Sequence, residues 1–302
     1  MNSHLKQVLT KGNPPKWLET NLHYVTIMGS MAYNCHHPHG EKSVKLSDMD
    51  LYGFAMPPKH IVFPHIAGYL HNFGKSPENF EQWQEHHIHG DIGYEYDVTI
   101  FSIIKYAQLC MDGNPNMIDS LFTPDNCVLH KTAVGAMMRD NRKLFLSKQV
   151  KVKMCAYAYQ QLRKLEANSH AGSEARKIDI ATNGYDTKKA YHTVRLVLQA
   201  EQVLTEGDLD LTANAEILKD IRAGNWKLQE LQDYFTNKEK LLDAAYHTSN
   251  LQQRPDEQAV KQLLLNCIEH HYGSLSNAEI VVPDKHMVLL NDLRGLLHKH
   301  GG

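Results

Sequence analysis

The spacing of hydrophobic positions changes along the chain, from short runs in the first part to helical periods in the second. Up to about Leu121, brief apolar or alternating runs separated by Gly, Pro and His predict β-strands. These runs are clearest over residues 24–28, 48–54 and 94–101. Beyond about Lys131 they give way to helical periods, so an α/β unit should be followed by a helical unit. We expect amphipathic helices over residues 150–168, 187–206, 213–223, 226–246 and 256–272.

Two connections are marked by turn residues. A helix over residues 102–111 should end at Asp112-Gly113-Asn114, and Pro115 suits the first turn of the next helix. The segment 169–186 is small and polar and contains two glycines, which predicts a mobile loop.

Composition and charge narrow the function classes. With 42% hydrophobic and 22% charged residues among 302, the chain has a globular composition and the length of one large or two modest domains. Lys and Arg number 32 against 34 Asp and Glu, and the resulting charge of −2 excludes a globally basic nucleic-acid coat protein. Apolar runs fall far short of the ~20 residues of a membrane helix, and the N-terminus has no apolar signal core. Five scattered cysteines, an odd number without a close pair, favour a reducing cytoplasm over a disulfide framework.

The first candidate site is the turn at Gly29-Ser30, directly after a predicted strand. Gly permits an unusual backbone turn, and a helix could begin at Ser30. The free N–H groups of such a turn bind anions, and the Ser hydroxyl adds a donor. Gly-Ser is also a common dipeptide, so this turn alone is weak support for a phosphate site.

Three acidic residues form the second candidate site. Asp48 and Asp50 stand two apart in a predicted strand, so their carboxylates share one face and suit Mg²⁺. In the strand 94–101, alternation places Glu95 and Asp97 on one face, and Asp97 is the preferred third ligand. If the two strands are neighbours, the cluster could hold two metal ions. The alternative is an ordinary strand with a solvated polar face.

The helix over residues 187–206 carries Lys188, His192, Arg195 and Gln199 at spacings of 4, 3 and 4, which places them on one stripe. The stripe could contact phosphates, since Arg offers a bidentate fork and Lys a point charge. By composition alone, a solvated cationic helix face is the more common explanation.

Histidines and tyrosines provide weaker signals. The groups at 36–39 and 86–89 could suggest zinc, but neither has Cys partners with finger spacing, so exposed loop histidines are expected. Tyr157 and Tyr159 are more often core or rim residues, but they could stack a base if they face a cleft.

Taken together, Gly29-Ser30, Ser47-Asp48-Met49-Asp50 and the later Asp97 resemble the DNA polymerase β-like nucleotidyltransferase superfamily. More narrowly, residues 29–33 and 47–54 are similar to the YcgL-type branch, which includes proteins associated with RNA ligases. Residues 113–116 and 188–196 are further matches. The stretch 34–46 is longer than the family's usual link between the two motifs.

The resemblance implies an α/β (α+β) nucleotidyltransferase core with a mixed sheet over residues 1–130, and a helical domain over 131–302 that completes the cleft. It implies transfer of a nucleoside monophosphate from an NTP to a hydroxyl, with release of pyrophosphate. Two Mg²⁺ ions, for which Mn²⁺ could substitute, would be held by the catalytic residues Asp48, Asp50 and Asp97. The implied nucleotide-binding residues are Gly29, Ser30, Ser47, Lys188, His192 and Arg195.

Three functions fit this resemblance. An RNA 3′ end is the favoured acceptor, in repair or modification of tRNA or another RNA in the cytoplasm. Transfer of AMP or another nucleotide onto a protein hydroxyl is an alternative that the net charge of −2 favours mildly. A non-catalytic nucleotide-binding module is the third, and the intact carboxylates argue against it.

Overall fold

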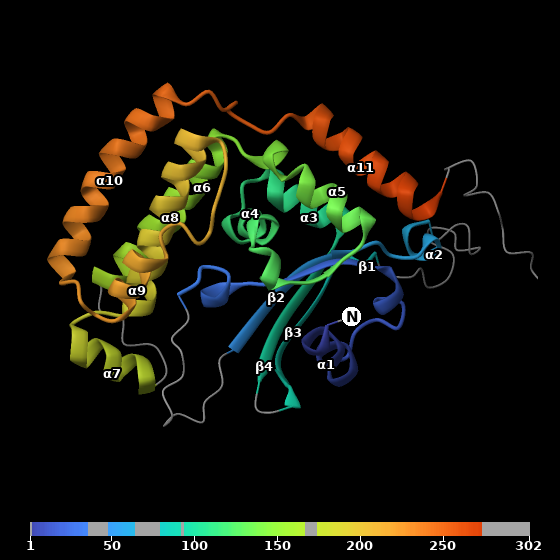
Figure 1. Ribbon diagram of the computed structural model, residues 1–302, viewed down its shortest axis with the longest axis horizontal. Coiled ribbons are helices and arrows are strands. Elements are labelled where there is room, and N and C mark those ends of the chain that lie inside the picture. Colours follow the sequence, from blue (N-terminus) through green and yellow to red (C-terminus); the bar gives the residue numbers. More distant parts are fainter. Residues whose placement is uncertain (1, 36–47, 64–78, 92–93, 167–173, 274–302) are drawn as a thin grey trace, which may run out of the picture.

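The computed structural model describes residues 2–35, 48–63, 79–91, 94–166 and 174–273. Strands gather in one part of the molecule, and a group of long helices lies beside them (Figure 1). Among the described residues no helix is long and apolar enough to cross a membrane.

Within these residues five strands form one mixed sheet in the order β3-β4-β2-β1-β5. β2 and β4 are parallel, whereas the pairs β1–β2, β1–β5 and β3–β4 are antiparallel. The mixed sheet expected from the resemblance is therefore confirmed. The strands are β1 (Leu22–Ile27), β2 (Asp48–Ala55), β3 (Gln82–His89), β4 (Glu95–Ser102) and β5 (Val128–Lys131).

The alternation predicted for β4 is also confirmed. Tyr96, Val98 and Ile100 are fully buried in a hydrophobic cluster with Leu5 and Val8 of α1 (Ser3–Lys11). Glu95 and Asp97 alternate with them and so belong to the opposite face. One face of this part of the sheet is thus sealed by α1, and the other carries the acidic residues.

The expected helix boundaries are set by caps. Ser102 accepts a hydrogen bond from the backbone N–H of Lys105 at the start of α3 (Ile103–Met111). Gly113 follows this helix with a φ of +67°, in the left-handed region that glycine tolerates best. Asn114 then caps α4 (Pro115–Phe122), in which Pro115 occupies the first turn.

The later helices follow the predicted periods closely. They are α6 (Lys148–Glu166), α8 (Thr187–Glu206), α9 (Ala215–Arg222), α10 (Leu228–Thr248) and α11 (Glu257–Tyr272). Beyond Lys131 no strand occurs among the described residues, as the sequence predicted.

Some expectations are wrong or incomplete. The segment 169–186 is not simply a loop, because α7 (Glu174–Asn183) occupies much of it. Residues 86–89 belong to strand β3 rather than to a loop, whereas residues 36–39 lie outside the described residues. The hydrophobic pattern did not predict α1, α2 (Lys59–Val62), β3, β5 or α5 (Ala133–Asp140).

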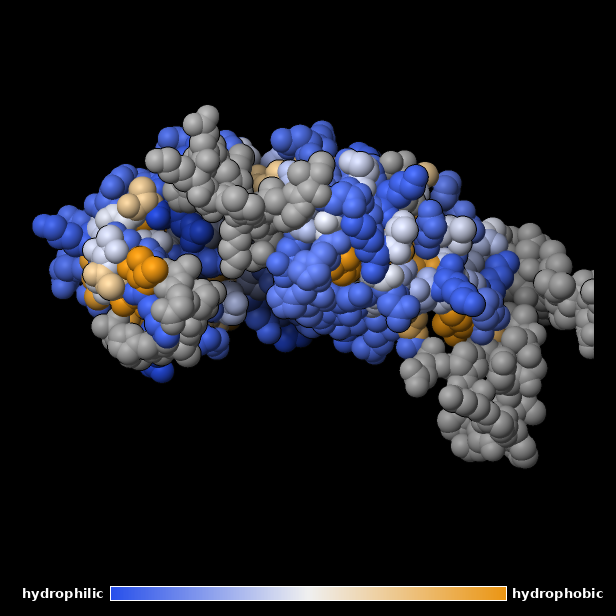
Figure 2. Space-filling model, turned by 90° about the horizontal axis from the view of Figure 1, so that it is seen from below, coloured by the Kyte–Doolittle hydropathy of each residue, from blue (hydrophilic) through white to orange (hydrophobic). Residues whose placement is uncertain are grey.

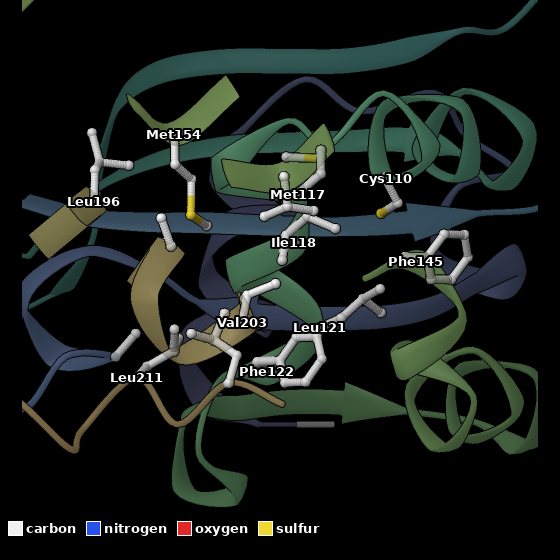
Figure 3. Close-up of a cluster of buried hydrophobic side chains, with 14 of the residues drawn as sticks. Cys110, Met117, Ile118, Leu121, Phe122, Phe145, Met154, Leu196, Val203 and Leu211 are labelled. Atoms are coloured by element: carbon white, nitrogen blue, oxygen red, sulfur yellow. The ribbon is translucent and has the colours of Figure 1, made fainter. Parts of the chain in front are cut away.

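The main core centres on α4. Ile118 and Leu121 of this helix are fully buried, and they pack in one cluster with Met154 of α6 and with Leu196 and Val203 of α8 (Figure 3). The same cluster extends from strands of the sheet to α11. The predicted division between residues 130 and 131 falls inside β5, so this shared core spans it.

The last described helix packs back against the first part of the chain. The ring nitrogens His23 Nε2 on β1 and His271 Nδ1 on α11 are 2.9 Å apart, and His23 Nδ1 lies 2.7 Å from the Thr132 hydroxyl. Burial, and next the neighbouring His271, lower the pKa of His23 to about 4, so it is neutral in the folded protein at pH 7. This contact ties α11 to the central sheet.

Two isoleucines test the location of the core. Ile118→Ala should lower the free energy of unfolding by about 2–5 kcal/mol, because Ile118 is fully buried and its removal leaves a cavity. Ile178→Ala on α7 is the matched control and should change it by less than about 0.5 kcal/mol, since Ile178 is 65% exposed. Urea unfolding measures the free energy of unfolding of both variants. An equal loss in the two variants would contradict the location of the core at Ile118.

Candidate active site

The first wall of the site is the turn that follows β1. Gly29 begins the 3-10 turn Gly29–Met31 with a φ of +72°. A Cβ atom on Gly29 would lie 3.1 Å from Asp50 Oδ2, so the backbone of the turn lies against the Asp50 side chain. The left-handed conformation favours glycine here, and an added Cβ would crowd the Asp50 carboxylate. Ser30 follows at a partly buried position, and the helix expected to start there is only this short turn.

The carboxylate residues come from two neighbouring strands. In the parallel register of β2 and β4, Asp48 pairs with Glu95, and Asp50 pairs with Asp97. Paired residues of adjacent strands, about 4.8 Å apart, extend to the same face. The sequence-based expectation that β4 lies beside the Asp48–Asp50 strand is confirmed. Ser47 and the side chain of Asp48 lie outside the described part of the chain.

Two histidines that sequence reasoning set aside contact this acidic face. Asp97 Oδ1 accepts a hydrogen bond from the backbone N–H of His87 at 2.9 Å, and Asp97 Oδ2 lies 3.3 Å from His86 Nδ1. The His87 ring contacts the carboxylate of Glu95. An irregularity in the pairing of β3 with β4, where His87 has a φ of +57°, brings both histidines to this face. The sequence held no signal for such a bulge.

No group of three or more His, Cys, Asp or Glu side chains within the described residues is arranged to hold a metal ion. Asp50 and Asp97 share a face with the Asp48 position, and the assignment of these three residues as metal ligands stays a prediction.

Opposite the sheet, α6 and α8 supply a cationic wall. A cavity of about 400 Å³ lies between these helices and the Gly29 turn. A recessed, strongly hydrophilic surface is visible in the helical part of the molecule, on the left of Figure 2. The cavity brings Gly29 and Asp50 together with Lys188, His192 and Arg195. Its lining residues are Met28, Gly29, Tyr33, Asp50, Tyr52, Asn116, Tyr157, Gln161, Lys164, Lys188, Lys189, His192 and Arg195.

Arg195 does not belong to a solvated stripe. It is 4% exposed, and its Nη1 donates a 2.5 Å hydrogen bond to Asp119 Oδ2. The Tyr33 hydroxyl donates to the same oxygen at 2.7 Å, and the guanidinium carbon lies 4.2 Å from the centroid of the Tyr33 ring. Gln199 is also buried, because α8 packs against α6, α9 and α10. The stripe therefore runs from exposed Lys188 into the core, which corrects the picture of a uniform cationic face.

The electrostatics of this buried pair define its role. Burial raises the pKa of the Asp119 carboxyl, and the Arg195 guanidinium opposes that rise. Arg195 Nε has no hydrogen-bond partner among the described residues, although the side chain lines the cavity. Asp119 thus holds Arg195 in place at the wall of the cavity.

Comparison with known proteins identifies the class. Over residues 13–279 the chain matches the RNA repair pathway DNA polymerase beta family, and it belongs to this family. The resemblance carried by Gly29-Ser30 and the paired aspartates is thereby confirmed. The protein is a member of a polymerase β-like nucleotidyltransferase family of an RNA repair pathway.

A search of curated proteins gave no match. Among solved structures, the chain is similar to a nucleotidyltransferase-like protein from Exiguobacterium sibiricum, with 10% identity, a TM-score of 0.27, and coverage of 99% of this chain and 92% of that one. It is also similar to the CD-NTase CdnG of Bradyrhizobium diazoefficiens in complex with GTP, with 9% identity, a TM-score of 0.22, and coverage of 88% and 91%.

Removal of Arg195 should show its structural role. Arg195→Ala leaves the Asp119 carboxylate buried without its cation, so the free energy of unfolding should fall by about 3–5 kcal/mol at neutral pH. The raised pKa of Asp119 lets it take up a proton in the folded variant as pH falls, and the deficit should therefore shrink from about pH 8 to about pH 5. Urea unfolding at both pH values measures this loss of unfolding free energy.

Lys188→Ala is the matched control from the same helix. Lys188 is exposed, so its loss should change stability by less than about 0.5 kcal/mol at either pH. A deficit of the Arg195 variant that grows at acidic pH would contradict the buried ion pair.

Proposed function

We propose that this protein is a Mg²⁺-dependent nucleotidyltransferase that moves a nucleoside monophosphate from an NTP to the 3′ hydroxyl of an RNA, including tRNA, and releases pyrophosphate. One observation carries the proposal: a single cavity joins the Gly29 turn and Asp50 to the cations Lys188, Lys189 and Arg195. An anion-binding turn, a carboxylate face and a cationic wall are the groups that phosphoryl transfer requires.

The chain's own residues would act mainly by positioning. The backbone N–H groups at Gly29 and the Ser30 hydroxyl would bind the β- and γ-phosphates from one side, with Ser47 beside them. Lys188, His192 and Arg195 would hold the phosphates from the other. The acceptor oxygen would then bond to the α-phosphorus while the bond to pyrophosphate breaks, and its proton would pass to a carboxylate of the sheet face.

The chemistry of the carboxylates on the sheet face supports a hard divalent cation as the cofactor. Asp50 and Asp97 lie side by side on parallel strands, the Asp48 position is on the same face, and carboxylate oxygens are the ligands that Mg²⁺ and Mn²⁺ prefer. When bound, two such ions would activate the attacking hydroxyl and neutralise the leaving phosphates.

The family supports RNA as the acceptor, and the cysteines support the cytoplasm as the compartment. The family belongs to an RNA repair pathway, which favours RNA over a protein hydroxyl as the acceptor. All five cysteines are free, as in a protein of the reducing cytoplasm.

The carboxylates are tested by substitution. Asp48→Ala and Asp50→Ala should each abolish nucleotide transfer, because the metal ions would lose a shared ligand, while the fold persists. Glu95→Gln on the same face is the control and should retain most activity. Incubation with each labelled NTP, Mg²⁺, and total RNA or total protein measures transfer. Near-normal turnover of either Asp variant would refute the metal site, and label confined to protein would refute the RNA acceptor.

Substitution of Lys188 tests the phosphate contacts without the loss of stability expected for Arg195→Ala. A charge-assisted hydrogen bond contributes about 1.5–3 kcal/mol, so Lys188→Ala should lower kcat/KM for the NTP roughly ten- to a hundredfold. The variant should also lose discrimination between an NTP and its NMP in binding assays. Lys6→Ala on α1, outside the cavity, should change neither quantity. Unchanged discrimination with weaker acceptor binding would reassign Lys188 to the acceptor.

A further inference from the structure

One face of α6 turns away from the core, and most of it lies outside the cavity described above. It covers about 160° of the helix circumference at 100° per residue, opposite the buried side that carries Met154 and Ala158. We call it the outer face of α6. Its residues, all exposed, are Val152, Lys153, Ala156, Tyr157, Tyr159, Gln160, Arg163 and Lys164.

The charge of α6 differs from that of the whole chain. The sequence of the helix, KQVKVKMCAYAYQQLRKLE, holds five Lys and Arg and a single acidic residue, whereas the chain carries a net charge of −2. Lys151 pairs with Asp243 of α10, on the inner side. Lys153, Arg163 and Lys164 make no ion pair with any described residue, so their charge faces solvent and favours a polyanion.

Aromatic rings are interleaved with these cations. Tyr157 and Tyr159 are 44% and 45% exposed, so their rings are accessible to a partner. The Arg163 guanidinium carbon lies 4.7 Å from the centroid of the Tyr159 ring, and Arg163 Nη2 is 3.4 Å from the Tyr159 hydroxyl. The result is an exposed surface that combines cations with aromatic rings.

The outer face continues into the candidate active site. Tyr157 and Lys164 line the cavity that also holds Gly29 and Asp50. Lys153, Tyr159 and Arg163 do not line it. A chain lying along the outer face could therefore place its end in the cavity without occupying the phosphate contacts of α8.

We propose that the outer face of α6 binds the single-stranded 3′ segment of the acceptor RNA. Lys153, Arg163 and Lys164 contact phosphates, and an unstacked base lies on the Tyr159 ring. The inference rests on the proposed function, because only an RNA acceptor of the transfer reaction would have to reach Asp50. Rings interleaved with cations suit a single strand, because every base offers a face for stacking and its backbone offers regular charge.

RNA binding can be measured separately from catalysis. Fluorescence anisotropy of the full chain with a labelled, unstructured single-stranded RNA, without NTP, should show affinity falling steeply from about 50 to about 200 mM salt. Lys153→Glu and Arg163→Glu should each weaken binding roughly tenfold at low salt and reduce the salt slope. Lys6→Glu makes the same charge change on α1 and should have little effect.

Two substitutions of Tyr159 distinguish the effect of base stacking from the effect of side-chain size. Tyr159→Leu should weaken binding about five- to a hundredfold, because a base loses its stacking partner, whereas Tyr159→Phe keeps the ring and should bind nearly as well as the unmodified protein. All variants are at exposed positions, and thermal unfolding verifies that they fold. Binding of a fluorescent NTP analogue should be unchanged in each of them.

The possible results separate this proposal from the proposed function. RNA binding that the variants weaken, together with no transfer from any NTP, would support the surface and refute the function. Transfer that persists onto protein, without RNA binding, would refute the surface. Unchanged RNA affinity in the α6 variants, or a loss of NTP binding in them, would also overturn it.

Discussion

The ion pair between Arg195 and Asp119 is the interaction on which the site depends. Asp119 lies on α4 at the centre of the core, Arg195 lies on α8, and Tyr33 follows the Gly29 turn. A carboxylate that is fully buried is costly unless its charge is compensated, so these three elements are held in one arrangement. The cationic wall and the Gly29 turn thereby face each other across the cavity.

The parallel pairing of β2 and β4 is the second constraint. It sets the register in which Asp50 and Asp97 become neighbours, and a shift of one residue would turn one of them toward the apolar cluster. The buried side chains of Tyr96 and Val98 oppose such a shift, since they would have to face the acidic side of the sheet. Hydrophobic burial on one face of the sheet thus positions the carboxylates on the other.

Exposure separates residues that the sequence presents as equivalent. Lys188 and Arg195 share a helical stripe, but one is exposed and the other is buried against an aromatic ring and a carboxylate. Tyr33 and Tyr159 are both tyrosines beside cations, but Tyr33 supports the site from within, whereas Tyr159 is on the surface that we assign to RNA. The same residue types therefore serve stability in one place and recognition in the other.

Local patterns determined much of this protein. Alternation in β4, the caps at Ser102 and Asn114, and the helical period of α8 act within a few residues, so they are readable from the sequence. The motifs at Gly29 and Asp50 also indicated the family. The tertiary structure alone decided that Asp119 is the partner of Arg195, because these residues are 76 positions apart and meet only when α4 and α8 pack together. It also decided that a bulge in β3 brings His86 and His87 to the acidic face, since backbone pairing between strands creates a bulge and side-chain periodicity does not record it.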